Sequence, residues 1–251
     1  MKRVAVSLVV LALGVSLSFA ANPFDQFQSL LSGQATSIAQ DRLDNFAKDL
    51  GVLLGGGSFH QGKSLGLPGF DVGIHVPVVK IKDEDTIIKG SLDSVALPIL
   101  QAEIGLPANL DLLARFTSYS DATMVGVGLR YGIIKKSIPG FPSLSAQAVY
   151  NTLNVNSGLN KLKATTMSVD CIASIDLPII TPYAGVGMDN TEVTPDSTIT
   201  DVTGANLKGK ASVMRLEAGI NLSLVPLTYL QLGGVLVNGD INYTAGLGIK
   251  F

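Results

Sequence analysis

Apolar and polar residues alternate along most of the chain, from about Gly66 to Phe251, in about ten separate segments. The segment MVGVGLRYGII, residues 124–134, is typical: apolar side chains take every second position, and glycines and Arg130 lie between them. Successive side chains of a β-strand point to opposite faces, so each segment predicts a strand with one apolar face and one polar or glycine-rich face. The pattern predicts an all-β domain.

A different period occupies the stretch from Asn22 to Leu54, where apolar residues recur at steps of three and four with polar residues opposite them. This spacing predicts one amphipathic helix, bent near Gly33. The three glycines at 55–57 then predict a flexible joint. The chain therefore divides into residues 21–57, a helix with a glycine linker, and residues 58–251, the domain built from strands.

Residues 1–20 have the features of a secretory signal peptide. A basic pair precedes an apolar run from Val4 to about Leu17, and cleavage is predicted after Ala20. A retained membrane anchor is the alternative. The exported chain keeps one cysteine, Cys171, which cannot close an internal disulfide.

Composition places this strand-rich chain in an apolar environment. Charged residues make up 15% of it, the formal net charge is −2 and the mean hydropathy is +0.39, with no basic face for nucleic acid. The uncharged stretch 219–239 is interrupted by Pro226 and by a glycine pair at 233–234, so it predicts two strands and a turn rather than a spanning helix. Strands that alternate over about ten residues then predict a transmembrane barrel with lipid outside and a polar interior.

A soluble β-sandwich also has alternating strands, but two features favour the barrel. The apolar face contains few large aromatic residues, which makes it poor material for a packed core. The predicted links also alternate in length: LPAN at 106–109 is short and NVNSGLNKLK at 154–163 is long, as in barrels with short periplasmic turns and longer outer loops. We expect an antiparallel barrel of about ten strands, or twelve if GSFHQGK at 57–63 and the long first loop add a hairpin.

With these features the chain resembles bacterial outer-membrane β-barrel proteins over about Gly66 to Phe251, and it also resembles uncharacterised porin-like proteins with an N-terminal helix. The resemblance implies the outer membrane of a diderm, Gram-negative-type bacterium and a monomer. It implies as partners outer-membrane lipids and lipopolysaccharide, periplasmic chaperones and the barrel assembly machinery. In that class the assembly machinery reads a terminal aromatic residue preceded by alternating apolar residues. The matching positions are Tyr243, Ala245, Leu247, Ile249 and Phe251.

Charged and hydrogen-bonding residues gather on the predicted inner face, together with many glycines. The predicted lumen-lining residues are Asp71, His75, Glu103, Asp111, Arg115, Arg130, Asp170, Tyr183, Arg215, Glu217 and Lys250. Unpaired charges in a narrow barrel are costly, so these residues predict a ladder of ion pairs; the lining of a water-filled path is the alternative. The glycines leave room inside, and we expect that room to hold the N-terminal helix as a plug. The alternative is a helix at the periplasmic mouth or on the membrane surface.

Catalytic chemistry finds little support in the sequence. The two histidines are His60 and His75, no G-x-S-x-G motif is present, and the acidic stretch KDEDTIIKGSLD lacks the glycine and terminal glutamate of a calcium loop. We predict no catalytic residue, metal or cofactor. The favoured function is a narrow or gated porin-like channel for small solutes. A structural or surface-adhesive barrel with a closed lumen is the alternative, and a barrel enzyme is the third.

Overall fold

The computed structural model describes residues 27–31, 34–89, 92–119, 121–135, 140–157, 160–195 and 207–251. The predicted signal peptide, residues 1–20, the start of the predicted helix, residues 22–26, and the predicted bend at Gly33 lie outside these ranges. The strands and helices given below are those of the described residues.

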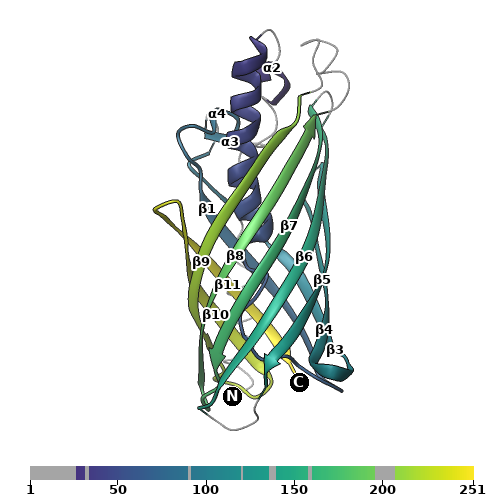
Figure 1. The fold of residues 1–251 in the computed structure, drawn as a ribbon, viewed down its shortest axis with the longest axis vertical. Helices are drawn as coiled ribbons and strands as arrows, with labels where there is room; N and C mark the ends of the chain where they lie inside the picture. The colour runs from purple at the N-terminus through teal and green to yellow at the C-terminus, as the bar shows by residue number, and fades with distance from the viewer. Residues whose placement is uncertain are drawn as a thin grey trace.

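Long antiparallel strands form a closed barrel (Figure 1). They are β1 (Phe70–Lys80), β2 (Ser94–Ala96), β3 (Ile99–Gly105), β4 (Leu110–Tyr119), β5 (Ala122–Ile134), β6 (Pro142–Ser157), β7 (Asn160–Ile175), β8 (Ile180–Pro195), β9 (Gly209–Leu222), β10 (Thr228–Val237) and β11 (Asp240–Lys250). Each strand pairs with its neighbour, and β11 closes the barrel on β1 in a register that runs from Asp71 opposite Lys250 to Val78 opposite Tyr243.

The described sheet contains eleven strands, but two of them share one place in the wall. The short β2 pairs with the upper part of β1 at Val78–Lys80, and β3 pairs with its lower part at Phe70–His75. The wall is therefore ten strands around, which confirms the predicted ten-strand antiparallel barrel. The twelve-strand alternative is wrong because residues 57–63 form no strand.

The two ends of the barrel differ, and we name them as they stand in Figure 1. The lower end is where β1 begins and β11 ends: the backbone N–H of Phe251 donates to the Phe70 carbonyl over 2.9 Å, and their rings lie 4.4 Å apart. The upper end carries the helices α2 (Phe27–Leu31) and α4 (Thr86–Lys89). The predicted long link at 154–163 is wrong, because β6 continues to Ser157 and β7 already begins at Asn160.

The helix α3 (Thr36–Gly55) stands in the upper half of the barrel and contacts β9, β8, β7, β6 and β1 (Figure 1). Its apolar stripe, which includes Leu43, Phe46, Leu50 and Leu54, is buried. The helix ends in the glycine run at 55–57, where Gly57 has a φ of +61° that favours glycine. Among the described helices none is long and apolar enough to cross a bilayer. Residues 56–69 then pass to the lower end, where β1 starts, and we call them the lumenal linker.

The inner face of the wall changes character with height. In the upper half it is apolar and packs against α3, in contrast to the polar interior expected along the whole barrel. The inward residues of this apolar half include Met124, Leu153, Leu162, Ala164, Val193, Val213, Val235 and Val237. This explains why β10 is apolar on both faces: Val235 and Val237 meet the helix, whereas Leu232 and Leu236 are exposed on the outside.

Candidate functional site

The lumenal linker fills the lower half of the barrel, where the wall is lined by glycines. A Cβ atom built on Gly185 would lie 2.7 Å from the ring of Phe59, and one built on Gly105 would overlap the backbone of Gly66. A Cβ on Gly62 of the linker would lie 2.7 Å from the carbonyl oxygen of Ile172 in β7. Backbone and side chains thus approach more closely here than a larger residue would allow. The room left by glycine holds the linker, whereas α3 lies higher.

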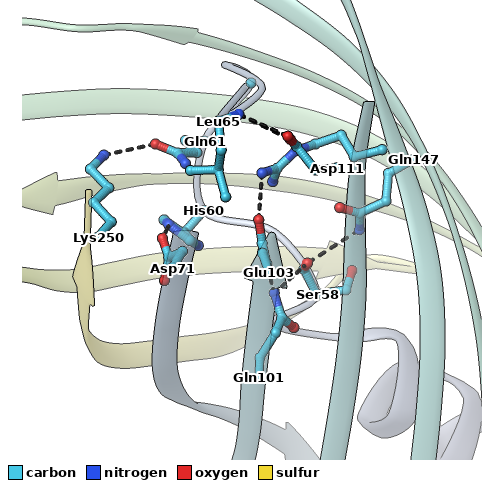
Figure 2. Close-up of polar contacts among 12 residues, drawn as sticks. Ser58, His60, Gln61, Leu65, Asp71, Gln101, Glu103, Asp111, Gln147 and Lys250 are labelled. Carbon is cyan, nitrogen blue, oxygen red and sulfur yellow. Dashed lines mark hydrogen bonds and ion pairs between the residues drawn. The ribbon is translucent and has the colours of Figure 1, made fainter. Parts of the chain in front are cut away.

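One buried ion cluster joins β3, β4 and β5 to the linker (Figure 2). The guanidinium of Arg130 contacts the carboxylate of Glu103 and donates from Nε to Asp111 Oδ2 over 3.0 Å. Asp111 also accepts the backbone N–H of Leu65, at 3.0 Å and 3.1 Å from its two oxygens. A buried arginine balanced by two carboxylates is tolerable because its charge is compensated, and the same carboxylate fixes the linker.

A second cluster surrounds Arg215 on β9. Its guanidinium contacts Asp170 at 2.6 Å, Asp189 at 2.9 Å and Glu217 at 3.3 Å. The carbon at the centre of the guanidinium lies 5.5 Å from the ring centre of Phe59 in the linker, within the range of a cation–π contact. Three neighbouring strands and the linker therefore meet at one arginine.

A third buried arginine binds the C-terminal end of α3. Arg115 on β4 donates to the carbonyl oxygens of Leu54, at 2.6 Å, and Gly56, at 2.8 Å. Asn151 on β6 donates to the Leu54 carbonyl as well, over 3.2 Å. The last carbonyls of a helix have no partner within the helix and carry partial negative charge, so a buried cation there is stabilising.

Two histidines form a cluster that looks like a catalytic arrangement. His60 Nε2 lies 3.1 Å from Asp71 Oδ2, and Tyr229 donates its hydroxyl to Asp71 Oδ1 over 2.8 Å. His75 Nδ1 lies 2.7 Å from Gln231 Oε1, and the His60 ring stacks on Tyr229 with centres 4.5 Å apart. All five side chains are buried and bonded to one another. His60 belongs to the lumenal linker and the other four residues to the wall, so the cluster joins the linker to β1 and β10.

A cavity of about 400 Å³ opens at the lower end beneath these clusters. Lys63 forms an ion pair with Asp176 at 3.1 Å across it, and Lys250 donates to Gln61 Oε1 over 2.7 Å. The linker itself forms part of this cavity wall, so the cavity ends where the linker begins to fill the lumen.

Ten of the eleven residues predicted to line the lumen are buried inside the barrel, and Lys250 lies at the lower mouth. The structure brings them into separate clusters rather than one ladder. The partners that sequence reasoning missed include Asp189, His60, Tyr229 and Gln231. Asp189 lies an even number of positions from Tyr183 on β8, so alternation places it on the inner face and could have added it to the predicted lumen-lining residues. His60 could not have been found in this way because it belongs to the linker.

The acidic residues and histidines of the described ranges do not gather as metal ligands. Across those ranges, no group of three or more His, Cys, Asp or Glu side chains is arranged to hold a metal ion. The charged and aromatic groups of the clusters join the lumenal linker to the wall at several heights.

Comparison with known proteins gives a family and a set of similar folds. The model of a family of unknown function, DUF6588, matches residues 86–251. No match was found among curated proteins. Among solved structures, the N-terminal β-barrel domain of Pseudomonas aeruginosa OprF is 13% identical, with a TM-score of 0.32, and the match covers 76% of this chain and 98% of that one.

Two further structures have similar values. The translocator domain of the autotransporter NalP from Neisseria meningitidis is 12% identical with a TM-score of 0.40, covering 86% of this chain and 99% of that one. The attachment invasion locus protein Ail of Yersinia pestis, in complex with the heparin analogue sucrose octasulfate, is 10% identical with a TM-score of 0.30, covering 73% and 96%. At these values the similarity concerns the fold alone.

Proposed function

The chain belongs to DUF6588, a family of unknown function, and we propose that it is an outer-membrane barrel held shut by its own N-terminal segment. In this proposal the barrel is a membrane-embedded scaffold, and its upper end, with α2, α4 and the start of α3, faces the cell exterior. The observation that carries the proposal is the filled lumen: α3 occupies the upper half and the lumenal linker the lower half.

The contacts that α3 and the lumenal linker make inside the barrel favour a closed resting state. Burial of Leu43, Phe46, Leu50 and Leu54 stabilises the docked helix by about 6–12 kcal/mol in total, at roughly 1.5–3 kcal/mol for each side chain. The ion clusters at Arg115, Arg130 and Arg215 would lose partners if the linker or helix moved. Spontaneous withdrawal would therefore be rare, which supports a closed barrel over a permanently open pore.

A gated channel is the second candidate, and a specific observation favours it. In the lower half polar groups of the wall bind the linker at Leu65 and His60, and a cavity of about 400 Å³ already enters from the lower end. If a signal moved the linker, the exposed wall would be polar and rich in glycine. Such a path would suit small hydrophilic solutes.

Conductance of the purified full-length protein in planar bilayers tests the proposal. We expect no steady current from the wild type, and current from a chain lacking residues 22–66, which removes both the helix and most of the lumenal linker. Heat-modifiable electrophoretic mobility of each sample would establish that its barrel is folded. Steady current from the folded wild type would contradict the closed barrel, and brief openings that a defined stimulus increases would favour the gated channel.

A further inference from the structure

The outward face of four neighbouring strands, β6 to β9, changes from apolar to polar at one level. The last apolar residues are Tyr150, Met167, Met188 and Met214, and the first polar ones are Thr152, Thr165, Asn190 and Ser212. The registers place these positions side by side: Met167 pairs with Tyr150 and with Asn190, which pairs with Ser212. Such a shared level is expected where a hydrocarbon layer meets the headgroups.

The height of this level fits the outer border of a membrane. At about 3.3 Å per residue and a tilt near 40°, β7 climbs about 30 Å from Ile175 near the lower end to Lys163. The apolar band of such barrels is about 25 Å tall. Lys163 and its neighbours therefore lie at the headgroups of the leaflet nearer the upper end.

A surplus of positive charge lies immediately above the border. We call Lys161, Lys163, Glu192, Lys208 and Lys210 the basic patch, and all of them are on the outward face of β7 to β9 or just before β9. Glu192 contacts Lys208 at 2.6 Å and Lys210 at 3.4 Å. Among these five residues one carboxylate faces four ammonium groups, which leaves three positive charges in excess. On the inner side, Asp44 accepts the backbone N–H of Lys210 over 2.7 Å.

A surface groove of about 390 Å³ connects the basic patch to the apolar band. Met167 and Tyr150 line its apolar side, and Lys210 and Glu192 its charged side, with Thr165, Asn190 and Ser212 between them. One end thus suits a hydrocarbon chain and the other an anion with hydrogen-bonding groups around it. The expected occupant is an amphiphile with a negatively charged head.

The opposite side of the upper end has no such surplus among the residues described there. Lys89 is bound by Asp83 at 3.2 Å and Asp93 at 2.9 Å, and Lys82 by Asp240 at 3.1 Å. Carboxylates outnumber lysines in these pairs. The positive charge is therefore localised on β7 to β9 rather than spread around the rim, so it would attract an anion to one face of the barrel.

We propose that the groove and the basic patch bind a phosphorylated glycolipid of the outer leaflet, with a phosphate between Lys163 and Lys210 and an acyl chain along Met167 and Met214. Lysine is a common phosphate ligand, and a basic group near a membrane surface contributes on the order of 1 kcal/mol to attraction of anionic lipid. The inference rests on the membrane location given under the proposed function, but it does not depend on whether the lumen is closed.

The test compares two triple variants with the same change in charge. Lys163→Gln, Lys208→Gln and Lys210→Gln remove the patch, and the control, Lys80→Gln, Lys82→Gln and Lys89→Gln, changes the other side of the upper end. Binding of purified lipopolysaccharide to each folded, detergent-solubilised protein would be measured by native mass spectrometry. We expect at least tenfold weaker binding for the patch variant and less than a twofold change for the control.

Two further probes identify the group that is recognised. Lipopolysaccharide with its lipid phosphates removed should bind the wild type at least tenfold more weakly than the intact form. Equal binding of the two forms, or unchanged binding by the patch variant, would overturn the proposal. Millimolar inorganic phosphate should leave binding almost unchanged; full displacement by it would show a simple anion site and would equally overturn a lipid site. Heat-modifiability in the same samples would show whether the barrel itself had failed.

Discussion

Gly51 of α3 lies directly against Thr191 of β8: a Cβ atom built on Gly51 would be 3.5 Å from the Cβ of Thr191. That separation falls within the range found in disulfides. We therefore predict that Gly51→Cys with Thr191→Cys, in a Cys171→Ser background, forms a disulfide on mild oxidation. A mobility shift that dithiothreitol reverses would detect it. Protein that stays fully reduced while folded would place the helix elsewhere.

The same pair separates the two candidate functions. A closed barrel shows no current whether the cysteines are reduced or oxidised. A gated channel would conduct on stimulation in the reduced form and lose that response when the helix is locked to β8. Each single-cysteine variant provides the matched control, since oxidation cannot cross-link it internally.

Arg115 should be needed to keep α3 docked. In Arg115→Met the carbonyl oxygen of Gly56 loses the guanidinium donor and that of Leu54 keeps only Asn151, which costs about 2–4 kcal/mol where water cannot replace the guanidinium. This predicts about 30- to 1,000-fold faster exchange of the α3 amide hydrogens through local opening of the plug. Lys80→Met, at an exposed position on β1, should leave the rates unchanged. Equal rates in both variants would show that Arg115 does not hold the helix.

The fit between the linker and the wall can be tested at Gly185. In Gly185→Ala the new methyl group would meet the Phe59 ring at 2.7 Å, so overpacking should destabilise the protein by about 1–3 kcal/mol. Gly234→Ala is the matched control because a Cβ there meets no described atom within 4 Å. Adding Phe59→Ala should relieve the Gly185→Ala clash and give a favourable coupling energy in a double-mutant cycle. Independent, additive effects would contradict the contact.

Much of this fold follows from alternation, yet the upper half of the barrel was misassigned for a physical reason. In Lys161 to Ala164 the outward residues are lysines and the inward ones are Leu162 and Ala164, the reverse of the arrangement near Met167. The same alternate residues of the strand keep pointing outward, but their surroundings change. Outside, lipid gives way to water; inside, the polar lumen gives way to the apolar helix. A rule that places apolar residues outward must end the strand here, which produced the false link at 154–163.

The clusters in the lumen show a second limit. The alternation of apolar and polar residues is enough to put Arg130 and Asp111 on the inner face. Their pairing, however, depends on the register between β4 and β5, where they are direct partners. His60 meets Asp71 only because the linker descends through the lumen beside the rising strand β1. That path depends on the helix and on the inner glycines together, and no local pattern specifies it.

Asp85 should make the local stability of α4, in the link between β1 and β2, depend on pH. Its Oδ1 accepts the backbone N–H groups of Ile87, at 3.0 Å, and Ile88, at 3.3 Å, so it caps α4. Burial, and then the neighbouring Asp49 carboxylate, raise the pKa of Asp85 from 3.8 to about 7. Because the folded pKa is the higher one, the protonated form is stabilising, and this contribution is complete below about pH 4 and is lost as the pH rises through about 7.

We therefore expect the Ile87 and Ile88 amides to exchange faster at pH 8 than at pH 5 after correction for the intrinsic rate. Asp85→Asn keeps the accepting oxygen without the charge, so its protection should be the same at both pH values. A wild type whose protection is unchanged between pH 5 and 8, or a variant that keeps the same dependence, would assign the effect to another group.

The orientation of the barrel gives a prediction that intact cells can test. Ser37, at the start of α3, is exposed at the upper end, whereas Ser223 follows β9 at the lower end and borders the lower cavity. In a Cys171→Ser background, Ser37→Cys should react with a membrane-impermeant maleimide added to whole cells, and Ser223→Cys should react only after the outer membrane is opened. The background without cysteine measures labelling of other proteins. Reaction of Ser223→Cys alone in intact cells would reverse the orientation, and with it would move the basic patch away from the outer leaflet.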